Sequence, residues 1–178
     1  MAGILTNKQG TLSYFRLGVL VSMIGLLAVL AGFVFWQLEH QARRSPFNVA
    51  VFPNAEEIRR DDNSATQRNI IFRVQAPPED VVAFYQAELD RHLDQDPRDP
   101  LRGNTHTLCV RVPVAGEFTD YVPGDGTLPF YHRCGFDNAF FGSQQSTVVE
   151  IQPGVRADNL DIDNTGYTFI IYDQRWSR

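Results

Sequence analysis

The chain has 178 residues, the length of about one ordinary domain, with 16 basic and 21 acidic residues and a formal net charge of −5. The charge is uneven, because residues 45–178 contain 12 arginines and no lysine against 20 acidic residues, a formal charge of −8. A surface of that sign repels phosphate backbones, so we expect no nucleic-acid partner.

An uncharged, apolar stretch of twenty residues runs from Leu17 to Trp36. As a helix it spans about 30 Å, which is the thickness of the hydrocarbon core of a bilayer. The apolar part of a cleaved signal peptide is shorter, about 7–15 residues, and is followed by small residues. Here the stretch ends in bulky residues instead. We therefore predict an uncleaved transmembrane helix in contact with membrane lipid.

The basic residues near the two ends of the span do not set its orientation. Lys8 and Arg16 precede it, and Arg43 and Arg44 follow it. The N-terminal tail is short, and both cysteines of the chain lie beyond the span. Long domains also cross a membrane largely regardless of charge. We predict a cytoplasmic tail (1–16), a transmembrane helix (17–36), a helical extension and linker (37–47) and a periplasmic or extracellular domain (48–178).

The extracytoplasmic part is predicted to be an α+β domain. The strongest helix signal starts at Pro77 and Pro78 and should end near residues 94–96, with Val82, Tyr85 and Leu89 on one apolar stripe. One amphipathic helix cannot bury its stripe alone, so we predict an antiparallel sheet packed against it. Strands are expected at 56–61, 67–75, 106–114, 128–134, 146–151 and 167–173.

Three segments carry a resemblance: Pro53-Asn-Ala55, Phe72-Arg-Val74, and the helix from Pro78 to Leu89. The pattern resembles that of uncharacterised bacterial membrane-anchored extracytoplasmic domains, with Pro-x-Ala followed by Pro-Glu-x-Val-x-x-Phe-Tyr-x-x-x-Leu. The match covers only residues 53–89. The chain departs from it at Asp94-Gln95, where those domains carry Gly-Trp. The resemblance implies an α+β domain that starts strand–helix–strand, and it implies no activity.

The two cysteines, Cys109 and Cys134, lie in strand-like runs. In an oxidising compartment such a pair forms a disulfide by default, and this is our prediction. A Cys₂His₂ metal site with His106 and His132 is the alternative. It is disfavoured because His106 and Cys109, three apart on a strand, would face opposite sides.

The segment from Asp161 to Gly166 matches the first half of a calcium-binding loop, with candidate ligands Asp161, Asp163 and Thr165. The match stops there, since the twelfth position is Tyr172 and not glutamate. The alternative interpretation is an ordinary turn before a strand. Other chemistry has no motif: we find no nucleophile in a catalytic setting and no phosphate-binding glycine loop, so we expect neither an enzyme nor a cofactor.

Small residues recur along one face of the predicted membrane helix. Their spacings are 4, 3, 3 and 4, and we call them the small-residue seam: Gly18, Ser22, Gly25, Ala28 and Gly32. Small residues let another helix approach closely, and in lipid such packing drives association. The seam predicts transmembrane helices of other membrane subunits as partners. The alternative is the ordinary glycine and alanine content of a membrane helix.

Three phenylalanines, Phe136, Phe140 and Phe141, occur in the glycine-flanked segment 134–142. We interpret this segment as a loop that either presents an apolar docking patch or fills the core.

Taken together, these features favour a non-catalytic, single-pass accessory subunit of a bacterial membrane protein complex, with a respiratory or photosynthetic electron-transfer assembly as the first expectation. The alternative is a free-standing, membrane-anchored binding or sensing domain that responds to calcium. An enzyme of unknown reaction is a distant third.

Overall fold

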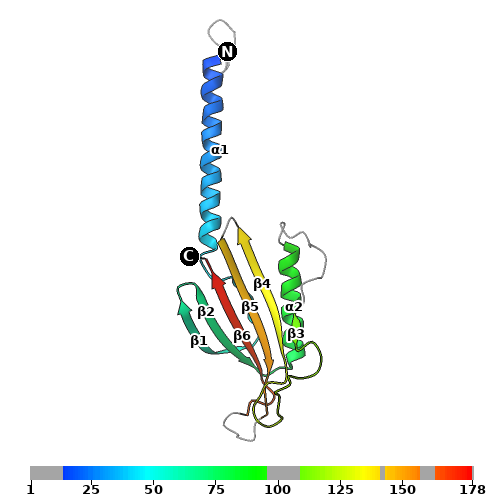
Figure 1. Cartoon of the computed structure of the whole chain (residues 1–178). Coiled ribbons are helices and arrows are strands. Elements are labelled where there is room, and N and C mark those ends of the chain that lie inside the picture. Colours follow the sequence, from blue (N-terminus) through cyan, green and yellow to red (C-terminus); the bar gives the residue numbers. More distant parts are fainter. Residues whose placement is uncertain (1–13, 96–108, 141–142, 157–162, 178) are drawn as a thin grey trace. The chain divides into compact units, whose positions relative to one another are not determined.

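A computed structural model describes residues 14–95, 109–140, 143–156 and 163–177. The chain divides into two compact units after Ala42. The first contains helix α1, and the second contains a sheet with helix α2 (Figure 1).

Helix α1 runs from Tyr14 to Ala42. Within Leu17–Ala42, an 18-residue window has a mean hydropathy of 2.6, and none of that window is buried in the chain's own fold. An α-helix satisfies its backbone hydrogen bonds internally, as a hydrocarbon environment requires. Within the described residues it is the one helix long and apolar enough to cross a membrane, and it fits a single-pass anchor. The predicted helical extension beyond Trp36 forms the last turns of α1.

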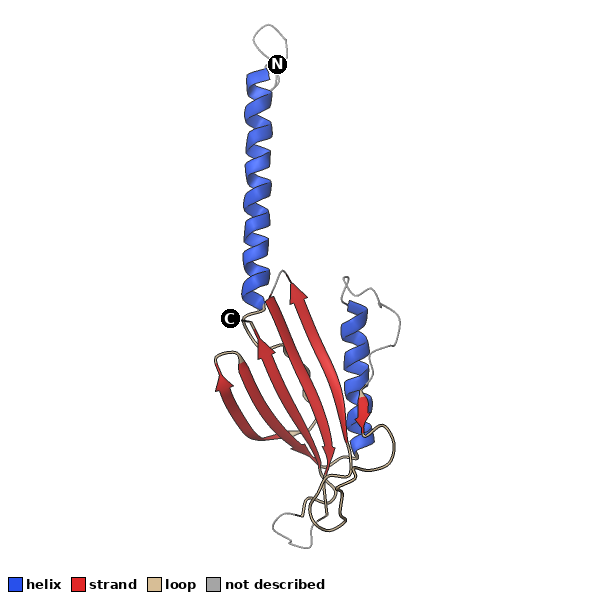
Figure 2. Ribbon diagram, viewed as in Figure 1, coloured by secondary structure: helices blue, strands red, loops and turns tan. Residues whose placement is uncertain are grey.

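The second unit is a six-stranded antiparallel sheet with α2 against one face, which confirms the predicted α+β class (Figure 2). The strand order is β1-β2-β6-β5-β4-β3. The strands are β1 (Glu56–Ser64), β2 (Gln67–Val74), β3 (Val110–Val112), β4 (Tyr131–Phe140), β5 (Ser143–Pro153) and β6 (Thr168–Trp176).

Helix α2 (Pro78–Gln95) contacts β4 and β5 through its predicted apolar stripe. Val81, Tyr85 and Leu89 are fully buried. These three side chains pack against the inward-facing side chains of the strands in one buried cluster. The other members of the cluster are Val49, Ile70, Phe72, Val74, Cys134, Phe136, Val149, Ile151, Ile170 and Tyr172. Apolar burial of this kind is the main favourable term in folding.

Residues 43–52, which we call the strap, have no regular secondary structure but lie against the covered face of the sheet. Their carbonyl groups accept hydrogen bonds from strand side chains. The Ser45 carbonyl accepts from Gln145 Nε2 at 2.8 Å. The Phe47 carbonyl accepts from Thr147 Oγ1 at 2.7 Å and from Gln174 Nε2 at 3.0 Å. The compact unit therefore begins at Arg43 and not at the expected residue 48, because the strap is part of the fold.

Two buried tyrosines extend this network to α2. Tyr172 Oη donates to the Ala50 carbonyl at 2.8 Å, so the hydroxyl of Tyr85, 2.8 Å away, donates to Tyr172. Tyr85 Oη in turn accepts from the backbone amide of Phe52 at 3.3 Å. Burial raises the pKa of Tyr85 to about 12 and raises the pKa of Tyr172 as well, so both phenols stay protonated at neutral pH.

Strand β4 differs from the prediction. The segment after Cys134 was interpreted as a loop, but β4 continues to Phe140 and pairs residue by residue with β5. The alternation of buried Cys134 and Phe136 with exposed Gly135 and Asp137 is a strand pattern that the glycine obscured.

Strand β3 is shorter than the strand expected at 106–114. Residues 106–108 lie outside the described part, and β3 is confined to Val110–Val112.

We predict that Tyr172→Phe lowers the free energy of unfolding by about 1–3 kcal/mol, because it leaves the Ala50 carbonyl without its donor. Chemical unfolding of the detergent-solubilised chain, followed by near-ultraviolet circular dichroism, measures this loss. Tyr121→Phe is the matched control and should change the free energy by less than about 0.5 kcal/mol. Equal effects of the two substitutions would contradict a structural role for the tyrosine network.

Candidate functional site

The predicted disulfide is present: Cys109 and Cys134 are bonded. It joins the residue before β3 to the fully buried position 134 of β4. The Cys109 amide also donates to Gln86 Oε1 of α2 at 2.8 Å. The bond therefore fastens the edge of the sheet beside α2.

The alternative metal site at these cysteines is wrong, because both sulfur atoms are consumed by the disulfide and neither can serve as a thiolate ligand. His106 lies outside the described residues. Burial, together with the nearby Arg111 guanidinium, lowers the pKa of His132, and Glu79 partly opposes this shift. At neutral pH His132 is thus a neutral imidazole beside the disulfide.

The described part of the calcium candidate is a turn. Asp163 Oδ1 accepts from the Thr165 amide at 3.1 Å and from Thr165 Oγ1 at 2.6 Å. Gly154 lies at the start of the same connection, which joins β5 to β6. A Cβ atom on this residue would lie 1.9 Å from the carbonyl oxygen of Asn164, so only glycine fits there. Asp161 lies outside the described residues, so calcium binding there stays a prediction.

The docking interpretation of the phenylalanines is wrong for Phe136, which is 2% exposed and belongs to the core. It packs near His92 of α2, with ring centroids 6.1 Å apart. Phe140 is the last residue of β4, and Phe141 lies outside the described residues. For Phe136 the core-filling alternative holds, because it shares the covered face with Cys134.

The small-residue seam lies on α1. A Cβ atom built on Gly18, Gly25 or Gly32 would meet no other heavy atom within 4 Å. The seam glycines therefore have open space beside them within the described chain, and a partner helix at this seam stays a prediction.

The free edge of β1 is a poor site for strand addition. All of its residues but one are exposed, and the register with β2 shifts in two places. The Arg60 guanidinium pairs with Glu57 at 2.6 Å, and the Arg59 guanidinium pairs with Asp61 at 2.7 Å. Charged side chains and irregular register are the features that protect edge strands against pairing with other chains.

The face of the sheet opposite α2, which we call the open face, is the larger candidate surface. The half-buried side chains of Ile71, Val148 and Ile171 lie at its centre. On β4, next to Val148, stands Gly135. The face also carries both arginines and acids, whereas residues 45–178 as a whole have a formal charge of −8. A mixed surface with an apolar centre is typical of protein–protein contacts.

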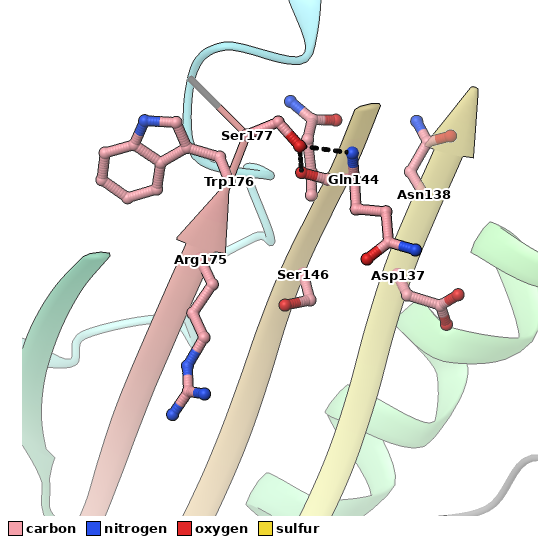
Figure 3. A pocket seen from close by; sticks show the side chains of 8 residues that line it. Asp137, Asn138, Gln144, Ser146, Arg175, Trp176 and Ser177 are labelled. Carbon is pink, nitrogen blue, oxygen red and sulfur yellow. Dashed lines mark hydrogen bonds between the residues drawn. The ribbon is translucent and has the colours of Figure 1, made fainter. Parts of the chain in front are cut away.

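A polar hollow of about 360 Å³ lies at one end of the open face (Figure 3). Asp137 on β4, Ser146 on β5 and Arg175 on β6 stand in register across three neighbouring strands. The end of the sheet adds the remaining lining side chains, Asn138, Gln144, Gln145, Trp176 and Ser177.

Hydrogen bonds hold the rim of the hollow in place. The Ser177 amide donates to the Gln144 carbonyl at 2.9 Å, and the Gln144 amide donates to Ser177 Oγ at 2.8 Å. Asn138 accepts a hydrogen bond from Arg43 at 3.3 Å, so the first residue of the strap reaches the same end of the sheet. The hollow can therefore bind polar groups on a stable frame. In the described ranges no three His, Cys, Asp or Glu side chains lie close enough together to hold a metal ion.

Comparisons of the chain with protein-family models, curated proteins and solved structures found no match. The resemblance to membrane-anchored extracytoplasmic domains therefore stays a prediction.

Sequence reasoning missed the hollow and the strap. The signal for the strap was present as Gln145, Thr147 and Gln174, polar residues at the same alternating strand positions as the buried Val149 and Tyr172. The hollow had no sequence signal, because Asp137, Ser146 and Arg175 come together only through strand register.

We predict that native protein alkylated without reductant carries no modified cysteine, by mass spectrometry. The double substitution Cys109→Ala and Cys134→Ala should lower the free energy of unfolding by about 3 kcal/mol, because it frees a loop of this length in the unfolded chain. Dithiothreitol should destabilise the wild type and leave the double variant unchanged. Two alkylated thiols in native material would contradict the disulfide.

Proposed function

We propose that the chain is a non-catalytic, single-pass accessory subunit of a bacterial membrane protein complex. In this proposal α1 packs between or beside helices of other subunits, and the globular unit occupies the extracytoplasmic face.

Helix α1 is the observation that carries the proposal. Its part from Leu17 to Ala42 is long and apolar enough to cross a membrane. The globular unit that follows has a core of its own, formed by the sheet, the strap and α2. A membrane helix followed by a separately folded unit supports the role of a single-pass subunit.

The small-residue seam supports the choice of partner. Gly18, Gly25 and Gly32 repeat every seven residues on a helix whose glycines no other described atoms contact. A simple membrane anchor needs only apolarity and length. A seam that admits a second backbone adds a means of packing against other membrane helices.

The disulfide supports the proposal that the globular unit lies outside the cytoplasm. Disulfides persist in the periplasm and outside the cell, and they are rare in the cytosol. Since Cys109 and Cys134 lie in the globular unit, we place this unit outside the cytoplasm and the N-terminal tail inside. A respiratory or photosynthetic electron-transfer assembly is the kind of complex that we propose first, because such assemblies commonly include single-pass subunits.

We predict that Gly25→Leu reduces co-purification of partner subunits from mild detergent. A leucine in the seam separates the helices by roughly a side-chain width, with a loss of about 1–3 kcal/mol of packing. Membrane insertion should be unchanged, because leucine raises the apolarity of the span. Quantitative mass spectrometry of the co-purified subunits measures the effect.

Leu27→Ile is the matched control, since it alters an exposed apolar position of α1 outside the seam. It should co-purify as the wild type does. If Gly25→Leu also co-purifies like the wild type, α1 is only an anchor, and the free-standing binding or sensing domain becomes the better proposal.

A further inference from the structure

We propose that the polar hollow at Asp137, Ser146 and Gln144 receives a basic side chain, preferably arginine, from a partner protein that docks on the open face. This inference rests on the proposed function for the identity of the partner, but its chemistry can be tested without one.

Two side chains of the hollow, Asp137 and Ser146, have no partner in the described chain, and both can accept hydrogen bonds. Neither the Asp137 carboxylate nor the Ser146 hydroxyl makes a hydrogen bond or ion pair with the described part of the chain. The one cation of the hollow, Arg175, is already paired with Asp173, at 2.8 Å and 3.4 Å. The hollow thus offers an unneutralised negative charge and is suited to a cation.

The cation should be organic and not a metal ion. Calcium and magnesium sites use several carboxylates or carbonyl oxygens at short range. The hollow has one unpaired carboxylate, and the described residues contain no cluster of metal-binding side chains. A guanidinium group carries five N–H donors in a plane and binds a carboxylate through two parallel hydrogen bonds. The Asp137 carboxylate can accept that pair, and the Ser146 hydroxyl and the Gln144 amide oxygen can accept further donors.

The hollow is continuous with a surface that a larger partner can use. Two residues before Asp137 on the same face of β4 stands Gly135. A Cβ atom at this position would meet nothing within 4 Å, and the backbone does not have a positive φ. Neither packing within the described chain nor backbone conformation requires glycine at this position. Because glycine destabilises a strand, its presence here needs another reason. A glycine in a strand often marks the close approach of another backbone.

Burial also favours a partner of protein size. Sites for small ligands enclose most of the ligand surface, whereas this hollow lies on an exposed sheet face. Val148, opposite Gly135, and Ile171, diagonally across from Val148, continue the open face from the hollow with half-buried apolar side chains, beside the charged residues Asp173 and Glu150. Arginine is among the residues most often found as an energetic centre of protein interfaces. The formal charge of −8 on residues 45–178 would attract a basic partner at long range.

The first test uses the full chain in detergent micelles and a titration followed by nuclear magnetic resonance. The probe is Nα-acetyl-arginine amide, which carries one guanidinium and no other charge. Nα-acetyl-citrulline amide is the control, since it has nearly the same shape and no charge. We expect the arginine probe to shift the backbone amide signals of Asp137, Gln144 and Ser146 with millimolar affinity, and the citrulline probe to leave them in place.

Two variants test whether the Asp137 carboxylate binds the arginine probe. Asp137→Asn should raise the Kd for the arginine probe at least tenfold. Asp125→Asn, which removes the same charge from an exposed loop position, should leave the Kd unchanged. Equal binding of the two probes, absence of any shift, or an unchanged Kd for Asp137→Asn would overturn the proposal.

The second test separates this inference from the proposed function. Where partner subunits co-purify with the wild type, Asp137→Arg should reduce their recovery at least tenfold, because it places a cation where the partner's cation binds. Unchanged recovery with Asp137→Arg, together with a loss in Gly25→Leu, would overturn the inference and leave the proposed function intact. If no subunit co-purifies with the wild type, the proposed function fails, and so does this docking site.

Discussion

The strap depends on one constraint: its backbone carbonyls lie under a sheet whose strands cannot bond them with their own backbone. These carbonyls are partly shielded from water, and a carbonyl that is fully shielded without a donor costs about 1–3 kcal/mol. The chain meets this requirement with side chains, since Gln145, Thr147 and Gln174 donate to strap carbonyls. Most of the inward positions near that end of β5 and β6 are therefore polar, and the apolar core with α2 occupies the remainder.

The same network continues into helix α2. The hydrogen-bond chain from the Phe52 amide through Tyr85 and Tyr172 to the Ala50 carbonyl ties strap, helix and sheet together. The strap is therefore part of the globular unit, which begins at Arg43.

The two faces of the sheet have different roles. The covered face is completed by α2 and the strap, so its residues are accounted for by internal contacts. The open face has half-buried aliphatic side chains, a glycine that internal packing does not require, and an Asp137 carboxylate without a partner in the described chain. These features fit the docking site proposed above. The disulfide beside α2 and the charged edge of β1 stabilise or protect the fold and leave this face unchanged.

The sequence by itself determined the elements whose signals are local. The twenty-residue uncharged apolar run predicted helix α1, which fits a single-pass anchor, and the spacing of Tyr85 and Leu89 marked the buried face of α2. Two cysteines in strand-like runs were enough to predict their bond. Only the tertiary structure decided that Phe136 is a core residue in a long strand, because Gly135 masks the alternation. It also decided the strap and the hollow, since these join residues from 9 positions apart, as in Asp137 and Ser146, to 127 positions apart, as in Phe47 and Gln174. Register and face, which no local pattern encodes, bring those residues together.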